Sequence, residues 1–234
     1  MIRPNLKISD KKYNDAVSVE SKSNKEYIFV LPPTQTAAIK KDFVFQAQDG
    51  TKLNTYLCFL GGGENTISIH YKIGRNAHVN THVFFLAWGE QKLLLDEKFQ
   101  FTETNSYGRF LTEGLVSQNA RVSCVGNIII DKDAQKTDSR LEMKSFLLGK
   151  NARSSMVPSL EIKANDVKAG HAATISQIDQ EQLFYLRSRG VTKQQAMRLS
   201  LEGMFENFIK NISDKKKANE LSEMVYSLYE KIIS

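Results

Sequence analysis

The sequence predicts a mainly β protein, a parallel β-helix or solenoid followed by a C-terminal α-helical region. Three observations lead to this prediction. β-Branched and aromatic residues alternate in short runs from Phe43 to about Ile175, a turn-like unit recurs within that stretch, and a helical pattern replaces both after about Ser176. An antiparallel β-sandwich is the competing fold, because short alternating strands also suit a sandwich.

Residues 1–40 are predicted to be an extended lead-in. The segment is rich in Lys, Ser and Asn, and Pro32-Pro33 interrupts its one apolar run, Tyr27 to Leu31. Proline cannot donate a hydrogen bond to a sheet ladder, so we expect this segment to contribute no more than one edge strand.

Residues 41–176 are predicted to form the β-helix core, with turns at Gly61-Gly62-Gly63 and Gly89. An Asn- or Asp-led unit, usually continuing with Ala, begins at residues 76, 119, 133, 151 and 165. Its last four copies start 14, 18 and 14 residues apart, so two successive steps span 32 residues, the expected length of one coil. Asn and Asp tolerate a left-handed backbone and Ala fits a tight inward corner, so the unit can turn the chain between stacked strands.

Residues 177–234 are predicted to be a C-terminal helical domain. Asp179 with Gln182 and Thr192 with Gln195 fit capping boxes, and Gly190 fits a helix end. Two apolar faces follow at helical spacing, and we expect them to form mostly a mutual core with a face left for a partner. Their residues are Met197, Leu201, Met204, Phe205, Phe208 and Ile212, then Leu221, Met224, Val225, Leu228 and Ile232.

Composition argues against several classes of protein. Cys58 and Cys124 lack a second Cys or His at zinc-site spacing, and each is expected to be a small buried hydrophobe. The net charge of +6 is diffuse, and Lys215-Lys216-Lys217 fits a solvated helix face, so no nucleic-acid partner is predicted. Acidic residues near the start and the lack of a long apolar stretch predict a cytoplasmic protein without a membrane partner.

Five motifs in order along the chain are more specific. They are AQKTD (134–138), LLGKNA (147–152), VPSLEI (157–162), DVKAGHAAT (166–174) and QLFYLRSRG (182–190). Together they resemble the SufB/SufD family of the SUF iron–sulfur cluster assembly system. The similarity is dense over about residues 106–208 and weaker over 43–105.

The resemblance implies a right-handed parallel β-helix whose C-terminal helical domain docks an ABC-type ATPase, SufC. It also implies a second β-helix as partner, either a SufB-like chain or another copy of this chain. The sequence itself has no phosphate-binding loop with the lysine that ATP hydrolysis needs, so any ATPase would be the partner. Family members usually carry a further N-terminal helical domain, so this chain is expected to be a short form.

His171 is the candidate metal or cluster ligand, because it matches the motif histidine of the family and imidazole can ligate iron. Without the resemblance, a structural histidine would be the expected interpretation. The SufB branch flanks this histidine with glutamates and has a cysteine near the position of Met143, whereas Gly170 and Ala172 flank it here. The resemblance therefore implies a SufD-like, non-enzymatic scaffold. Any iron–sulfur cluster would be transient, at a subunit interface, and not bound stably by this chain alone.

The second candidate site is an ATPase-docking segment formed by Phe184, Tyr185, Arg187, Arg189 and Gly190. Aromatic residues beside arginine are typical of interaction hot spots, and glycine lets the chain reverse between two helices. The resemblance implies that this segment binds SufC, and ordinary helix packing is the alternative.

Two other functions stay open. A polysaccharide-acting β-helix enzyme would need clustered carboxylates, and the similar region offers mainly Glu142 and Glu161. An interaction protein could also keep the fold without any cluster role.

Overall fold

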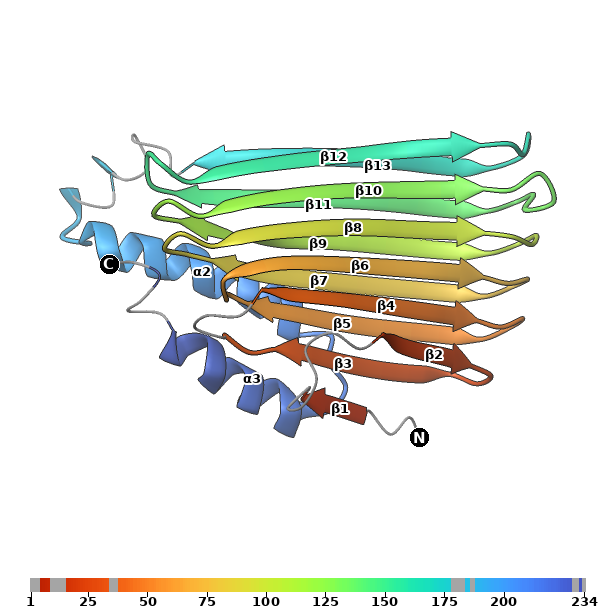
Figure 1. The fold of residues 1–234 in the computed structure, drawn as a ribbon, viewed down its shortest axis with the longest axis horizontal. Coiled ribbons are helices and arrows are strands. Elements are labelled where there is room, and N and C mark those ends of the chain that lie inside the picture. The colour runs from red at the N-terminus through yellow and green to blue at the C-terminus, as the bar shows by residue number, and fades with distance from the viewer. Residues whose placement is uncertain are drawn as a thin grey trace.

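Two stacked parallel sheets form the body of the molecule (Figure 1). The computed structural model describes residues 5–8, 16–33, 38–177, 184–185, 188–228 and 232. The seven-stranded sheet has the order β1 (Asn5–Ile8), β3 (Lys25–Leu31), β5 (Lys52–Leu60), β7 (His78–Ala87), β9 (Tyr107–Ser117), β11 (Asp138–Leu148) and β13 (Lys168–Gln177). The six-stranded sheet contains β2 (Val17–Ser21), β4 (Ile39–Ala47), β6 (Glu64–Ile73), β8 (Lys92–Phe101), β10 (Arg121–Ile130) and β12 (Arg153–Ile162).

Consecutive strands alternate between the sheets, and all the described strand pairs are parallel. Each coil therefore contributes one strand to each sheet, as in a β-solenoid. The predicted parallel β-helix is confirmed. An antiparallel sandwich would instead pair consecutive strands through hairpins.

The solenoid begins before the predicted boundary at residue 41. β3 pairs with β5 on one side and β1 on the other, so it is not an edge strand. Phe29 and Leu31 are buried in the same core as the later coils. Pro32-Pro33 follows the last residue of β3, so neither proline removes a hydrogen bond from the ladder.

Apolar side chains that alternate along the strands fill the space between the sheets. Residues at the same register position lie one above another on successive coils. Phe45, Tyr71 and Phe99 make such a stack, with ring centroids 4.7 and 5.3 Å apart. Stacking of this kind gives each coil the apolar cover that it could not provide alone.

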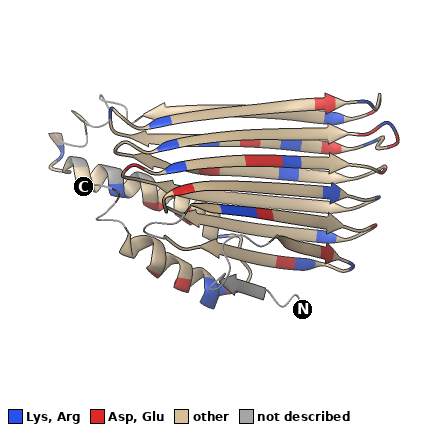
Figure 2. Cartoon of the chain, viewed as in Figure 1, with Lys and Arg blue, Asp and Glu red and all other residues tan. Residues whose placement is uncertain are grey.

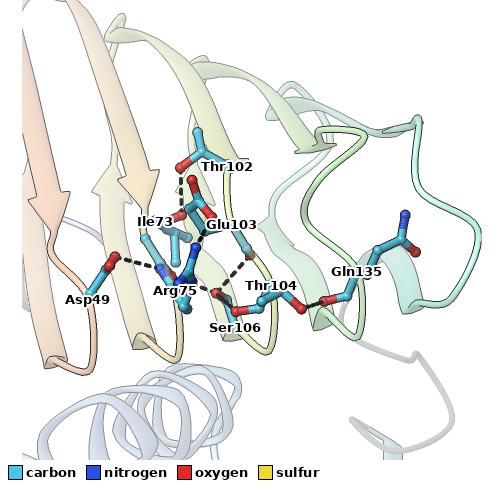
Figure 3. A network of polar contacts seen from close by, with 9 residues as sticks. Asp49, Ile73, Arg75, Thr102, Glu103, Thr104, Ser106 and Gln135 are labelled. Atoms are coloured by element: carbon cyan, nitrogen blue, oxygen red, sulfur yellow. Dashed lines mark hydrogen bonds and ion pairs between the residues drawn. The ribbon is translucent and has the colours of Figure 1, made fainter.

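The corners between strands use residues in the left-handed region. In one row Gly50, Asn76, Asn105 and Lys136 have φ of 69°, 53°, 60° and 59°. The amides of Asn76 and Asn105 donate to the next coil at Thr104 O (3.1 Å) and Gln135 O (2.9 Å). Side chains add further bonds from coil to coil, as Figure 3 shows around Arg75, Thr104 and Ser106.

The predicted alanine corners are confirmed, because Ala77, Ala120, Ala134 and Ala152 are fully buried. The expected coil length is also confirmed for the later coils, since Asn151 donates to Asn119, 32 residues away. An earlier coil is shorter, since Asn80 donates to Asn54 across 26 residues. The left-handed residue is not always the Asn or Asp of the unit. It is Gln118 at one corner and Lys136 at another.

The helices α2 (Lys193–Ile209) and α3 (Lys215–Ser227) pack on the outer face of the seven-stranded sheet. Thr192 and Gln195 form the predicted capping box of α2, whereas Asp179 and Gln182 lie outside the described residues. The expectation of a mostly mutual helical core is wrong, since both apolar faces share one cluster with the sheet. This helix–sheet cluster contains Ile28, Tyr56, Cys58, Phe84, Leu86 and Leu115 with Leu201, Phe205, Phe208, Leu221 and Val225.

Charged side chains of both signs are interspersed along the coils, as Figure 2 shows for one view. This distribution matches the diffuse charge of the sequence. Among the helices that the structure describes, none combines the length and hydropathy needed to cross a lipid bilayer.

Candidate functional site

His171 lies at the open end of the solenoid. It is on β13 and pairs with Leu141 of β11, whose side chain is fully buried between the sheets. Paired residues of parallel strands point to the same side, so His171 continues an inward-facing row. Its side chain is nevertheless exposed, because β13 is the last strand of its sheet.

The open end consists of the edge strands β12 and β13, each paired on one side only within the described chain. Their inward-facing positions have no further coil above them. Ile162 and Ile175 accordingly expose 43% and 45% of their surface. An edge with unpaired backbone groups and exposed apolar residues can add strands from another chain.

No metal centre is preformed around His171. Among the described residues there is no group of three or more His, Cys, Asp or Glu side chains that could hold a metal ion. Gly170 and Ala172 offer no ligand beside the histidine. Met143 is buried in the row below, where it pairs with Ala173. A cluster at this end would need most of its ligands from another molecule.

Both cysteines are buried, as expected. Cys58 lies in the helix–sheet cluster and Cys124 lies between the sheets. Burial raises the pKa of the Cys58 thiol, and burial together with Glu97 and Asp96 raises that of Cys124. The thiolate form that binds metal is therefore disfavoured at both positions.

The predicted docking segment presents its aromatic residues to solvent. Phe184 and Tyr185 expose 75% and 58% of their surface. The Arg189 guanidinium lies 5.4 Å from the centroid of the Tyr185 ring, within cation–π range. Gly190 has a φ of +84°, which glycine adopts without strain, while Arg187 lies outside the described residues.

A buried polar network that the sequence did not predict fixes α2 to the sheet. His82 Nε2 and Glu113 Oε1 are 2.7 Å apart, and Asn207 Nδ2 donates to the same oxygen at 3.0 Å. The ring of Phe208 packs edge-on against His82, with centroids 4.9 Å apart. Asn207 and Glu113 are 94 residues apart in sequence, so no local motif could have revealed the contact.

The carboxyl group of Glu97 lies inside the solenoid. Thr112 Oγ1 lies 2.7 and 2.8 Å from its two oxygens, and both residues are buried. Burial raises the pKa of Glu97 from 4.5 to about 7. The native state therefore keeps a proton that the unfolded chain loses at lower pH.

Replacing Glu97 by glutamine should change how stability depends on pH. Between about pH 5 and 7 the native state binds the extra proton, so the free energy of unfolding of the parent chain falls as pH rises. Compared with the Glu97→Gln variant, the parent chain should lose about 1.4 kcal/mol of unfolding free energy per pH unit at most, and this loss should level off above pH 7. Urea titrations at several pH values measure it.

Glu90→Gln, in the exposed turn before β8, is the matched control. It should leave the pH profile close to that of the parent chain. Parallel profiles for Glu97→Gln and the parent chain would contradict the assignment of the raised pKa to Glu97.

Residues 16–204 match the family model for the SufBD core domain of the SUF system of FeS cluster assembly. Over 91 residues the chain is 43% identical to the iron–sulfur cluster assembly protein SufD of Escherichia coli (strain K12), a match covering 39% of this chain and 22% of that protein. A SufBD family protein of Mycobacterium leprae is 36% identical over 128 residues, covering 53% and 33%.

A SufBD family protein of Pyrococcus horikoshii is 25% identical over 187 residues, covering 80% of this chain and 40% of that protein. The chain therefore spans less than half the length of these three relatives. The family model, in contrast, extends over the solenoid and into α2.

Proposed function

This chain belongs to the SufB/SufD family, and from that membership we propose that it is a non-catalytic, SufD-like scaffold subunit of a SUF-type iron–sulfur cluster assembly complex. The observation that carries the proposal is the family match over residues 16–204, which includes both candidate sites. The named relative SufD and the lack of the SufB-type cysteine and glutamates support the SufD-like role.

In this proposal the open end of the solenoid pairs with a second β-helix, either a SufB-like chain or another copy of this chain. Two features support it: the edge strands β12 and β13, and the exposed apolar residues Ile162 and Ile175. His171 would then face the interface and supply one ligand to a transient cluster. The partner would supply the rest, so no cluster is held stably by this chain alone.

The docking segment binds a SufC-like ABC ATPase in the same proposal. Exposed aromatic rings beside an arginine, at Phe184, Tyr185 and Arg189, support this role. The segment precedes α2, which the His82–Glu113–Asn207 network fixes to the sheet. Movement of a bound ATPase would therefore act on the solenoid through α2.

Anaerobic reconstitution with iron and sulfide tests the scaffold role. The chain alone should show no stable visible charge-transfer absorbance, whereas a mixture with a SufB-like partner should. His171→Ala should lower the absorbance of the mixture without preventing the chain from folding. His78→Ala is the matched control, because His78 stacks on Tyr107 and lies on β7, three strands away from β13 in the same sheet. A full signal with His171→Ala, or a stable cluster on the chain alone, would contradict the proposal.

The two alternatives have less support. Glu142 and Glu161, the carboxylates considered for a polysaccharide-acting enzyme, lie on β11 and β12 in different sheets. Each is paired with a basic side chain, at Arg140 and Lys163 respectively. An interaction protein without a cluster role would bind partners yet give no absorbance in any reconstituted mixture.

A further inference from the structure

A groove on the outer face of the seven-stranded sheet belongs to neither candidate site. It has a volume of about 480 Å³ and lies beside the connection between α2 and α3. Pockets of several hundred Å³ are the size that binds small molecules. The residues that define its chemistry are Asn54, Tyr56, Asn80, Arg109, Arg140 and Glu142.

Strand register builds the polar side of the groove. Asn54, Asn80, Arg109 and Arg140 are successive Cα partners on β5, β7, β9 and β11. Neighbouring strands are about 4.8 Å apart, so the four side chains stand in one row on one face. Asn80 donates to Asn54 at 3.0 Å. The row therefore ends in two guanidinium groups on adjacent strands.

Two like charges directly opposite each other on adjacent strands are unfavourable. Here each arginine has one acidic neighbour. Arg109 donates through Nη2 to Asp138 Oδ1 at 2.9 Å and through Nη1 to the main-chain oxygens of Gly108 and Asp138, which leaves its Nε and one Nη2 hydrogen for a ligand. Arg140 donates through Nε to Glu142 at 2.7 Å. Within the described part of the chain Arg140 bonds only through Nε, so both terminal NH₂ groups remain available. These groups can bind an anion beside Arg109.

The other side of the groove is mixed. Tyr56 and Leu111 provide apolar surface, and the Tyr56 hydroxyl donates to Asn211 O at 2.8 Å, which closes the wall with the α2–α3 connection. Hydrogen bonds from Arg140 and Lys144 hold the pKa of Glu142 below its usual value. Glu142 is therefore a charged acceptor next to the arginines, suited to a hydroxyl or amino group of a ligand.

We propose that this groove binds a small organic anion, a carboxylate or phosphate ester that also carries a hydroxyl or amino group. Its charged group bonds to Arg109 and Arg140, as planar guanidinium groups do with carboxylates and phosphates. Its hydroxyl or amino group donates to Glu142. A bound anion between the two guanidinium groups also offsets their mutual repulsion.

Calorimetric titration of the full chain tests the proposal with three probes. Citrate represents a hydroxylated carboxylate, glycerol 3-phosphate a hydroxylated phosphate ester, and glycerol the uncharged control. Binding of citrate or glycerol 3-phosphate, but not of glycerol, is expected, and the tighter of the two identifies the anion class. The absence of heat with both anions at about 10 mM would overturn the proposal, since charge-assisted bonds in a formed pocket should be detected there.

Two substitutions should act in opposite directions. Arg140→Gln should weaken anion binding by about tenfold or more, because it removes a charged donor. Glu142→Gln should tighten the binding of sulfate, which has no hydroxyl or amino group to donate to Glu142, because the substitution removes a negative charge and releases Arg140 Nε. Damage to the fold could not produce both changes. Arg121→Gln, on β10 of the other sheet and exposed, is the matched control and should change nothing. If Arg140→Gln and the parent chain bound the anion with equal affinity, the proposed site would be wrong.

Hydrogen exchange gives a second readout. The bound anion should protect amides around Asn211, because that residue forms one wall of the groove. Protection confined to other parts of the chain would place the anion elsewhere and contradict the assignment.

Discussion

Replacing Phe205 by alanine is expected to lower the free energy of unfolding by about 3–5 kcal/mol. The side chain is fully buried in the helix–sheet cluster. Its ring lies 5.2 Å from Phe84 of β7 and 5.9 Å from Phe208, measured between centroids. Truncation removes these contacts and leaves a cavity between α2 and the sheet, which the rigid solenoid cannot close.

Urea unfolding followed by circular dichroism measures this change. Leu199→Ala is the matched control, because Leu199 lies on the same helix with 56% of its surface exposed. Leu199→Ala should change the free energy of unfolding by no more than about 0.5 kcal/mol. If Phe205→Ala lowered the free energy of unfolding no more than Leu199→Ala does, α2 would not be fixed to the sheet through Phe205.

Replacing Tyr185 by alanine is expected to weaken binding of a SufC-like ATPase by about thirtyfold or more. The ring is 58% exposed, is placed against Arg189 by a cation–π contact, and has Phe184 beside it in the chain. A central aromatic anchor of an interface typically contributes 2 kcal/mol or more, which corresponds to this factor. Surface plasmon resonance with the immobilised ATPase measures the loss.

Tyr107→Ala provides a close control for this experiment. Tyr107 also packs against an arginine, with the Arg109 guanidinium 4.0 Å from its ring centroid, but it lies on the solenoid strand β9. Binding of the ATPase should be unchanged. Equal losses for Tyr107→Ala and Tyr185→Ala would show that the docking segment has no special role.

The coiled architecture could be predicted from sequence because its cause is local. A coil must turn twice, and several of the turns here place a small inward residue such as Ala77 or Ala134 within two residues of a left-handed position. The identity of the left-handed residue was less predictable, since Gln118 and Lys136 take this conformation despite their side chains. Backbone bonds between successive corners, such as Lys136 N to Asp166 O, accompany this conformation.

Contacts between distant segments could not be predicted. The helical apolar faces were visible as patterns, but the sequence did not say that Phe205 would pack on Phe84 rather than on another helix. The solenoid starts before the predicted residue 41, because Pro32-Pro33 indicates an edge strand in the sequence whereas both prolines follow β3 in the structure.

The candidate sites, too, were predictable from the sequence only in part. A sequence motif located His171, but only strand register shows that it ends an inward-facing row above Leu141. The pairing of Arg109 with Arg140 depends on a coil of 31 residues between β9 and β11 and has no local signature. The exposure of Phe184 and Tyr185 likewise required the structure, although their composition had suggested an interface.

We propose that this chain works as a subunit of a SUF complex through a SufC-like ATPase. Titration of the 234-residue chain with a purified SufC-type ATPase tests it most directly. One ATPase should bind per chain, with a dissociation constant of about 1 μM or below, as specific interfaces commonly reach. No complex at about 50 μM, with an ATPase that hydrolyses ATP normally, would contradict the claim.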